Sequence, residues 1–211
     1  YHLSGIVENS KRLVMMNPES FESKYNIDAR VNSEVVAINR ANKTVTVKHV
    51  ETNETYEESY DELILSPGAS PIVPNLQGVD LPHVFTVRNV VDIEKLQTAI
   101  VEKDAKNIAV VGGGFIGVEV AENLRLAGRG VSLVEFAPQI LMPFDEDMVQ
   151  ILHKEVTDHG VELVINDGLA KITETSIVLN SGKEIQADIV VLAIGVRPET
   201  SLAKDAGLDI G

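Results

Sequence analysis

The chain has 211 residues, a formal net charge of −14 and no cysteine. The charge disfavours binding to nucleic acid or to an anionic membrane surface, and without Cys there is no disulfide, thiolate metal site or Cys nucleophile within these residues. No apolar run approaches the roughly 20 residues that span a bilayer, and the first residues carry no signal-peptide pattern. We therefore expect a cytoplasmic protein.

The first 65 residues predict a short helix followed by a β-meander. Asn17 and Pro18 are typical of a helix start, as N-cap and first helical residue, and the helix is expected to reach about Tyr25. Alternating and apolar runs predict strands at 33–39, 44–50, 55–59 and 62–65. The last of these is expected to be buried and to end at Ser66.

Residues 67–82 contain four prolines and two glycines, which is typical of an irregular connector and indicates a domain boundary. Beyond it, helical patterns alternate with short apolar runs, which favours a parallel sheet. We expect helices at 91–103, 115–127, 146–159 and 199–206, strands at 107–111, 131–134, 161–165 and 188–194, and an antiparallel meander within 170–187.

Two of these helices show apolar residues at helical spacing, so we expect one stripe of each to face the core. On the helix at 115–127 the expected inner residues are Ile116, Val120, Leu124 and Ala127. On the helix at 146–159 they are Met148, Ile151, Leu152 and Val156.

A glycine motif joins the strand at 107–111 to the helix that follows it. Gly112, Gly114 and Gly117 have the spacing G-x-G-x-x-G. Gly112 would permit a tight turn, Gly114 would let a pyrophosphate approach the backbone, and Gly117 would let the helix pack closely on the strand. The free N–H groups at the helix start attract phosphate. The order of strand, turn and helix therefore predicts a dinucleotide site.

Glu135 follows the next strand, 23 residues after Gly112. A carboxylate there can accept hydrogen bonds from the adenosine ribose hydroxyls and would repel a 2′-phosphate. Residues 136–140 offer no Arg or Lys to bind such a phosphate, although Arg129 could still reach the site. The sequence therefore favours NAD(H) over NADP(H).

An internal similarity links residues 60–68 with residues 187–195. Each segment is an apolar run that follows a meander and ends in Gly68 or Gly195. The similarity indicates two related nucleotide-binding domains, and two ordinary buried strands remain the alternative.

Three stretches carry a family resemblance: Ser-Pro-Gly-Ala at 66–69, Gly-Gly-Gly-Phe-Ile-Gly-Val-Glu at 112–119 and Ala-Ile-Gly-Val-Arg-Pro at 193–198. Together they resemble the FAD-dependent pyridine nucleotide–disulfide oxidoreductases, in the branch of coenzyme A–disulfide reductase and NADH oxidase/peroxidase. The resemblance implies an α/β fold. Residues 89–211 would form a Rossmann-like NAD(H)-binding domain with a parallel sheet, helices and an antiparallel β-meander. Residues 1–88 would be the middle portion of a split, related FAD-binding domain.

The resemblance also implies that the chain is an internal fragment. The family's own FAD-binding G-x-G-x-x-G is missing, and Tyr1 resembles the Tyr of a C-G-x-P-Y segment, so the redox Cys would lie just upstream. A second FAD segment and a dimerisation domain would follow Gly211. The parent protein is expected to be a homodimer. The fragment is expected to be inactive, with its first 88 residues dimerising or disordered.

The resemblance implies roles for the residues already singled out by the glycine motif and adds further site residues. Those implied to contact the dinucleotide are Gly112, Gly113, Gly114, Ile116, Gly117, Glu135, Phe144 and Gly195. Those implied to contact FAD are Ser66, Pro67, Gly68, Ala69 and Arg88. Phe115 would gate the nicotinamide pocket and Glu119 would lie near the nicotinamide, so both are catalytic candidates. Glu119 and Arg88 are alternatively surface charges. The five histidines show no metal-ligand spacing and are interpreted as solvated or packing residues.

The implied reaction passes a hydride from NADH to FAD and, through the upstream Cys, to a small-molecule disulfide of the CoA-disulfide type, to peroxide or to oxygen. Two alternatives remain: a ferredoxin-reductase-type flavoprotein with an iron–sulfur partner, and a dinucleotide-binding module without catalysis. No metal, nucleic acid or membrane partner is expected.

Overall fold

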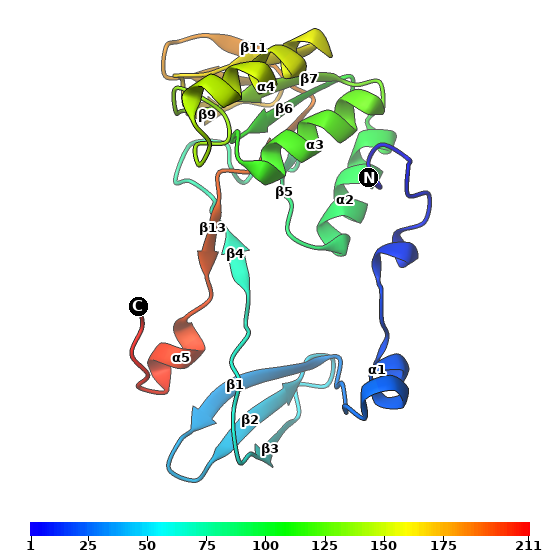
Figure 1. Cartoon of the computed structure of the whole chain (residues 1–211), viewed down its shortest axis with the longest axis vertical. Helices are drawn as coiled ribbons and strands as arrows, with labels where there is room; N and C mark the ends of the chain where they lie inside the picture. Colours follow the sequence, from blue (N-terminus) through cyan, green and yellow to red (C-terminus); the bar gives the residue numbers. More distant parts are fainter. The chain divides into compact units, whose positions relative to one another are not determined.

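The computed structural model describes all residues 1–211. The chain forms two compact units (Figure 1). The first contains Tyr1–Leu13 and Pro71–Arg197, and the second contains Val14–Ser70 and Pro198–Gly211. The chain passes between them after Leu13 and again within β4 (Ala69–Pro71) and β13 (Val196–Pro198), which pair as a two-stranded sheet. No helix is both long and apolar enough to cross a membrane.

A parallel sheet of five strands is the centre of the first unit and confirms the predicted fold class. Its order is β5 (Val84–Thr86), β12 (Ile189–Leu192), β6 (Asn107–Val111), β7 (Gly130–Val134) and β8 (Val161–Val164). The central strands are almost wholly buried, which explains why they read as continuous apolar runs. Because β5 belongs to this sheet, the sheet begins before residue 89, and the assignment of FAD and NAD portions on either side of that residue stays a prediction.

The two faces of the sheet pack against different layers. One layer contains the helices α2 (Val90–Glu102), α3 (Phe115–Leu126) and α4 (Glu146–Asp158). The short 3-10 helix η1 (Ser10–Leu13) contacts α2 and buries no residue. The other layer is the predicted antiparallel meander of β9 (Leu169–Ile172), β10 (Ser176–Leu179) and β11 (Glu184–Gln186). Alternate residues of β6 divide between them: Ile108 and Val110 join the helix-side core, and Ala109 and Val111 join the meander-side core.

The buried stripes of α3 and α4 differ from the predicted ones. On α4, Val149 is fully buried and His153 and Val156 are half-buried. The prediction was wrong for Met148, Ile151 and Leu152, which are 57%, 66% and 37% exposed. On α3 the buried residues are Gly117, Val120, Ala121, Asn123 and Leu124, so the prediction was wrong for Ile116 and Ala127. The sheet covers only a narrow stripe of each helix, and apolar residues beside that stripe stay in solvent.

One carboxylate aligns the starts of the two central strands. Asp188 Oδ2 accepts hydrogen bonds from the backbone N–H groups of Lys106 and Asn107, each at 2.8 Å. Asp188 immediately precedes β12, so the bonds fix the register between β12 and β6 at the amino end of the sheet.

The second unit is a three-stranded antiparallel meander with two helices. Its elements are α1 (Pro18–Tyr25), β1 (Ser33–Asn39), β2 (Thr44–His49), β3 (Thr55–Ser59) and α5 (Ser201–Asp205). Asn17 caps α1 as predicted, because its side chain accepts the N–H of Ser20 at 2.9 Å. Among the apolar residues of this unit, only Val45 and Val47 of β2 are buried.

The predicted buried strand at residues 62–65 is wrong. These residues form no strand, and Ile64 is 89% exposed. An apolar run forms a strand only when another strand satisfies its backbone N–H and C=O groups, and no other segment of this chain pairs with it. In the internal similarity, therefore, only the second segment contains a strand, β12, although Gly68 and Gly195 both have positive φ.

Candidate functional site

A pocket of about 600 Å³ opens at the carboxyl edge of the parallel sheet, within the first unit. The ends of β6, β7 and β12 supply most of its lining, which includes Gly112, Gly113, Gly114, Phe115, Glu135, Ala193 and Gly195. Parallel strands bring their carboxyl ends to the same edge, and ligands of open α/β sheets bind there. The fold thus gathers residues that are more than 80 positions apart in sequence.

Glycine is needed at two positions where β6 turns into α3. Gly112 has φ of +111°, and a Cβ atom there would lie 2.3 Å from the carbonyl oxygen of Ala193. A Cβ on Gly117 would lie 1.8 Å from the carbonyl oxygen of Gly112. The chain therefore turns sharply, and α3 passes close to the end of the strand it follows.

The start of α3 is suited to an anion. Its N-cap is Gly114, which has no side chain to cap the helix, and its first turn carries no acidic residue. The first N–H groups of a helix have no intrahelical acceptor and carry the positive end of the helix dipole. These donors, beside an open glycine turn, fit a pyrophosphate.

The Glu135 carboxylate is fixed beside this turn. Its Oε2 accepts the N–H of Gly113 at 2.6 Å, and its Oε1 accepts the N–H of Ala137 at 2.7 Å. The side chain is half-buried at the pocket wall. A carboxylate has about four acceptor positions, so two remain for hydroxyl donors of a ligand.

Residues 136–144, which we call the β7–α4 loop, cover the glycine turn. The N–H of Leu141 donates to the carbonyl oxygen of Gly113 at 2.8 Å, and Gln139 Nε2 donates to the carbonyl oxygen of Phe144 at 2.8 Å. The Phe144 ring meets the Phe115 ring edge-on, with centroids 6.0 Å apart. The two aromatic residues predicted for the site are therefore neighbours.

The opposite wall comes from the segment after β8 and from the meander. It includes Asp167, Gly168, Leu169 and Asn180. The Ser181 hydroxyl and backbone N–H groups donate to Asp167, and these hydrogen bonds hold the pKa of that carboxyl below its usual range. The pocket thus carries two carboxylates, Glu135 and Asp167, and no basic side chain among its lining residues.

The remaining predicted residues lie around this pocket or away from it. Ile116 and Glu119 are exposed on α3 and do not line it. Arg88 is exposed before α2, where its backbone N–H donates to Asp92 at 3.1 Å. The segment 66–69 belongs to the second unit, and none of its residues lines the pocket.

Several lining residues were not predicted from the sequence. They are Pro74, Leu76, Val111, Val134, Phe136, Leu141, Met142, Pro143, Asp167, Gly168, Leu169, Asn180, Ala193 and Ile194. One signal could have found part of this set: Asn166-Asp167-Gly168 is a turn sequence directly after a predicted parallel strand, at the edge where ligands bind. The residues from the meander and from 74–76 carry no such local signal.

The glycine turn, the uncapped helix and the fixed carboxylate at the sheet edge define an α/β dinucleotide-binding domain. Comparison with known families then gives the particular one. The chain belongs to the pyridine nucleotide-disulphide oxidoreductase family, whose model matches residues 3–211.

Three relatives illustrate the match. An NADH oxidase of Methanocaldococcus jannaschii is 36% identical over 215 residues, which cover 100% of this chain and 48% of the relative. The crystal structure of reduced CoADR-RHD from Bacillus anthracis matches with a TM-score of 0.97 and 47% identity, covering 100% of this chain and 38% of that one. The water-forming NADH oxidase from Lactobacillus brevis, bound to NADH, matches with a TM-score of 0.84 and 32% identity, covering 96% and 45%. The chain spans about half the length of the curated relatives it matches.

Proposed function

We propose that the chain binds NADH in the pocket at the carboxyl edge of the parallel sheet. The pyrophosphate would lie on the N–H groups at the start of α3, and the adenosine ribose hydroxyls would donate to Glu135. The observation that carries this proposal is the Glu135 carboxylate held 2.6 Å from the Gly113 amide. This contact supports the proposal that Glu135 accepts the ribose hydroxyls beside a turn that binds the phosphates.

NADH is favoured over NADPH in this proposal. A 2′-phosphate would stand next to the ionised Glu135, with Asp167 on the facing wall, and no basic side chain lines the pocket. Like charges at close range in a partly buried site repel each other. The relative from Lactobacillus brevis is named an NADH oxidase and is bound to NADH, which supports NADH as a ligand of this pocket.

In a longer protein of this family, we propose that the bound NADH serves a flavin-dependent reduction. FAD, when bound, would supply the acceptor for the hydride and pass the electrons on to a disulfide, to peroxide or to oxygen by way of a Cys outside these residues. The relatives named as an NADH oxidase and as CoADR support oxygen and coenzyme A disulfide as acceptor classes.

The residues of this chain would bind and orient the nicotinamide half. Phe115 stands at the start of α3, 58% exposed, with its ring supported by Phe144, so it can cover or uncover a ring bound at the pocket mouth. Glu119 lies one turn further along α3 and is exposed, so it is free to accept a hydrogen bond from the carboxamide. Ser66 to Ala69 and Arg88 are proposed FAD contacts in the longer protein.

Calorimetric titration of the chain with NADH, NADPH and FAD tests the proposal. We expect NADH to bind more tightly than NADPH, and Glu135→Ala to weaken NADH binding roughly 10- to 100-fold, because hydrogen bonds to a charged acceptor are lost. Glu122→Ala, which removes an exposed carboxylate of α3, is the matched control and should leave the affinity unchanged.

Three outcomes contradict parts of the proposal. Unchanged NADH affinity in Glu135→Ala would remove the assigned ribose site. Stoichiometric FAD binding to the chain alone would mean that its nucleotide pocket, or another site in it, takes a flavin. Consumption of NADH by the chain with added FAD and disulfide would show that the catalytic parts are not missing.

A further inference from the structure

The β7–α4 loop is a strained element that its surroundings hold in place. Leu141 has φ of +49°, a left-handed conformation that costs a residue other than glycine roughly 1–3 kcal/mol. The Ile140 side chain is fully buried, and its Cγ2 lies 2.7 Å from the position that a Cβ on Gly113 would take. The loop therefore packs directly on the turn that is proposed to bind the pyrophosphate.

One of the loop's anchors is a histidine of α4. The N–H of Ile140 donates to His153 Nε2 at 3.2 Å. An imidazole nitrogen accepts a hydrogen bond only when it carries no proton, so this contact requires the neutral ring with its proton on Nδ1. A doubly protonated ring carries an N–H group at both nitrogens. Its Nε2–H would then face the Ile140 N–H, and two donors cannot form a hydrogen bond.

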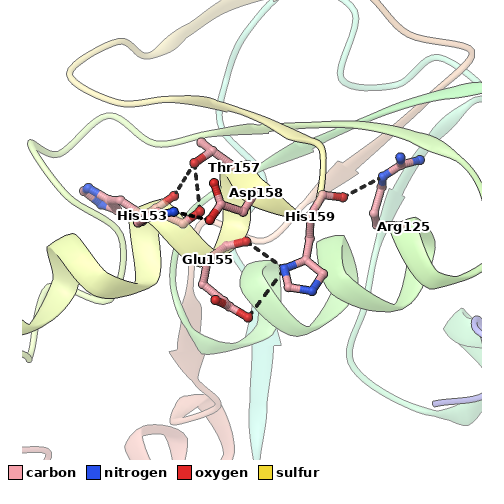
Figure 2. A network of polar contacts seen from close by, with 7 residues as sticks. Arg125, His153, Glu155, Thr157, Asp158 and His159 are labelled. Carbon is pink, nitrogen blue, oxygen red and sulfur yellow. Dashed lines mark hydrogen bonds and ion pairs between the residues drawn. The ribbon is translucent and has the colours of Figure 1, made fainter.

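His153 occupies a position on α4 that favours this contact. Val149, His153 and Val156 have the spacing i, i+4, i+7 and are the inward residues of the helix, whereas His159 near the helix end is exposed. Figure 2 shows His153 on α4 and His159 directly after its end, with Arg125 of α3 donating to the His159 carbonyl oxygen at 2.9 Å. Of these two histidines, only His153 contacts the β7–α4 loop.

We propose that His153 is a positioning residue for the nucleotide: its neutral imidazole holds the β7–α4 loop on the glycine turn, and its protonation releases this anchor and weakens dinucleotide binding. The inference rests on the proposed function and deepens it. Histidine is the side chain whose charge ordinarily changes between pH 5 and 8, so a pH series over this range tests the anchor. Binding would tighten as the pH rises.

The nearest residues on the loop and on α4 supply no other free charge that could change the contact between His153 and Ile140. The β7–α4 loop has no titratable side chain. On α4 the residues one turn away on either side, Val149, Gln150, Val156 and Thr157, are uncharged. Lys154, the next residue, is ion-paired with Asp158.

Charged groups on the other packed elements are engaged elsewhere. On β8, Val161 and Leu163 belong to the helix-side core, and Glu162 bonds to Ser132 of β7 and to Lys183. Arg125 of α3 reaches only the far end of α4. Glu146 lies on the same stripe of α4, roughly 10 Å along the axis toward the helix start.

The test measures binding of ADP-ribose, which contains the adenosine and pyrophosphate parts, between about pH 8 and pH 5.5. For the unmodified chain we expect the dissociation constant to rise roughly 3- to 10-fold on acidification, the range set by one backbone hydrogen bond. His153→Gln keeps an acceptor at a similar reach but does not titrate, so it should bind normally at pH 8 and lose the pH dependence. His153→Leu should bind weakly at both values, and His159→Gln should behave like the unmodified chain.

Amide exchange of the free chain gives a second readout that needs no ligand. Exchange at Ile140 and Leu141, corrected for intrinsic rates, should accelerate on acidification in the unmodified chain but not in His153→Gln. A pH-independent dissociation constant, or a His153→Gln variant that keeps the full pH dependence, would overturn the inference. If ADP-ribose and NADH fail to bind at every pH, the proposed function fails, and the exchange data alone then decide whether His153 anchors the loop.

Discussion

At the scale of single residues, Glu135 does two things with one carboxylate. It accepts two backbone N–H groups, from Gly113 in the phosphate turn and from Ala137 in the β7–α4 loop, and it faces the pocket. Those bonds fix its rotamer before any ligand arrives, so little side-chain entropy is lost on binding. The proposed ribose acceptor and the proposed phosphate donors are therefore held in one rigid arrangement.

Gly114→Ala should separate binding from folding. A Cβ at Gly114 has no neighbour within 4 Å, and this residue adopts a conformation open to any side chain. We expect the free energy of unfolding to change by less than about 0.5 kcal/mol. Alanine is a weaker N-cap residue than glycine, but it also lowers the conformational entropy of the unfolded chain, and the two effects oppose each other. The methyl group would stand where the pyrophosphate approaches. NADH affinity should fall roughly 10-fold or more, by the cost of overpacking.

Gly112→Ala should, in contrast, mainly reduce the stability of the folded chain. The residue combines a φ of +111° with a Cβ position 2.3 Å from the Ala193 carbonyl oxygen. Backbone strain and steric overlap together should cost about 3 kcal/mol or more. Urea denaturation of Gly112→Ala and Gly114→Ala in parallel checks this, and equal midpoints for the two variants would contradict the assigned turn.

At the scale of elements, local signals located helices and strands but did not decide which faces they bury. The Asn17-Pro18 cap and the glycine turn were readable because each depends on neighbouring residues alone. The inward stripe of α4 was misassigned because Met148 and Ile151 are as apolar as the residues that are buried, and only the width of the sheet excludes them. The strand predicted at residues 62–65 was wrong for a related reason, since an apolar run does not show whether another strand will pair with it.

The sequence likewise predicted part of the site but not all of it. Gly112, Gly113, Gly114, Phe115, Glu135 and Gly195 meet in one pocket because each follows a parallel strand, and the sequence shows that order. The contact between Ile140 and His153 joins a loop and a helix through one ring nitrogen, and no spacing rule indicates it. Asn180 and Pro74 reach the pocket from elements whose docking depends on the whole sheet.

The stripe of α3 gives a matched test of helix burial. Leu124 is fully buried, whereas Leu126, two residues later, is 60% exposed. Leu124→Ala should destabilise the chain by about 2–5 kcal/mol, because a large core side chain leaves a cavity. Leu126→Ala should change stability by less than about 0.5 kcal/mol. Chemical denaturation measures both, and similar losses in the two variants would contradict the observed face.

At the scale of the whole molecule, apolar burial is divided unequally. The first unit holds two large clusters of buried residues, and the second holds only Val45 and Val47. Local stability follows the number of buried apolar contacts. Amides of β1 and β3 should therefore exchange with solvent well before those of β6 and β12. Hydrogen exchange followed by mass spectrometry checks this, and equal protection in both units would contradict it.

Stability should also fall as the solution is acidified. Burial of His83, helped by the nearby positive charge of Lys103, lowers its pKa, and its Nε2 has no hydrogen-bond partner. The folded state favours the neutral His83 ring. At a pH between the pKa of His83 in the folded chain and its pKa in the unfolded chain, the unfolded chain therefore binds more protons. Stability is then highest above about pH 6.5 and decreases as the pH falls toward the folded pKa.

Denaturant midpoints at about pH 7.5 and 5.5 measure this dependence. His83→Gln should reduce the difference between the two midpoints, and the exposed His159 supplies the control, since His159→Gln should leave the difference as it was. A His83→Gln variant with the full difference would show that other groups cause it. Asp167, whose pKa is lowered by its hydrogen bonds to Ser181, contributes further loss only at more acidic pH.

The strand order of the parallel sheet has a consequence for the chain during its synthesis. β12 lies between β5 and β6, yet it is the last of the five strands to leave the ribosome. Until residue 192 has emerged, β6 can pair with β7 on one side only, and its other edge remains open. The nascent chain must keep that edge from pairing with other chains while some 80 further residues are made, and only the arrival of β12 closes it.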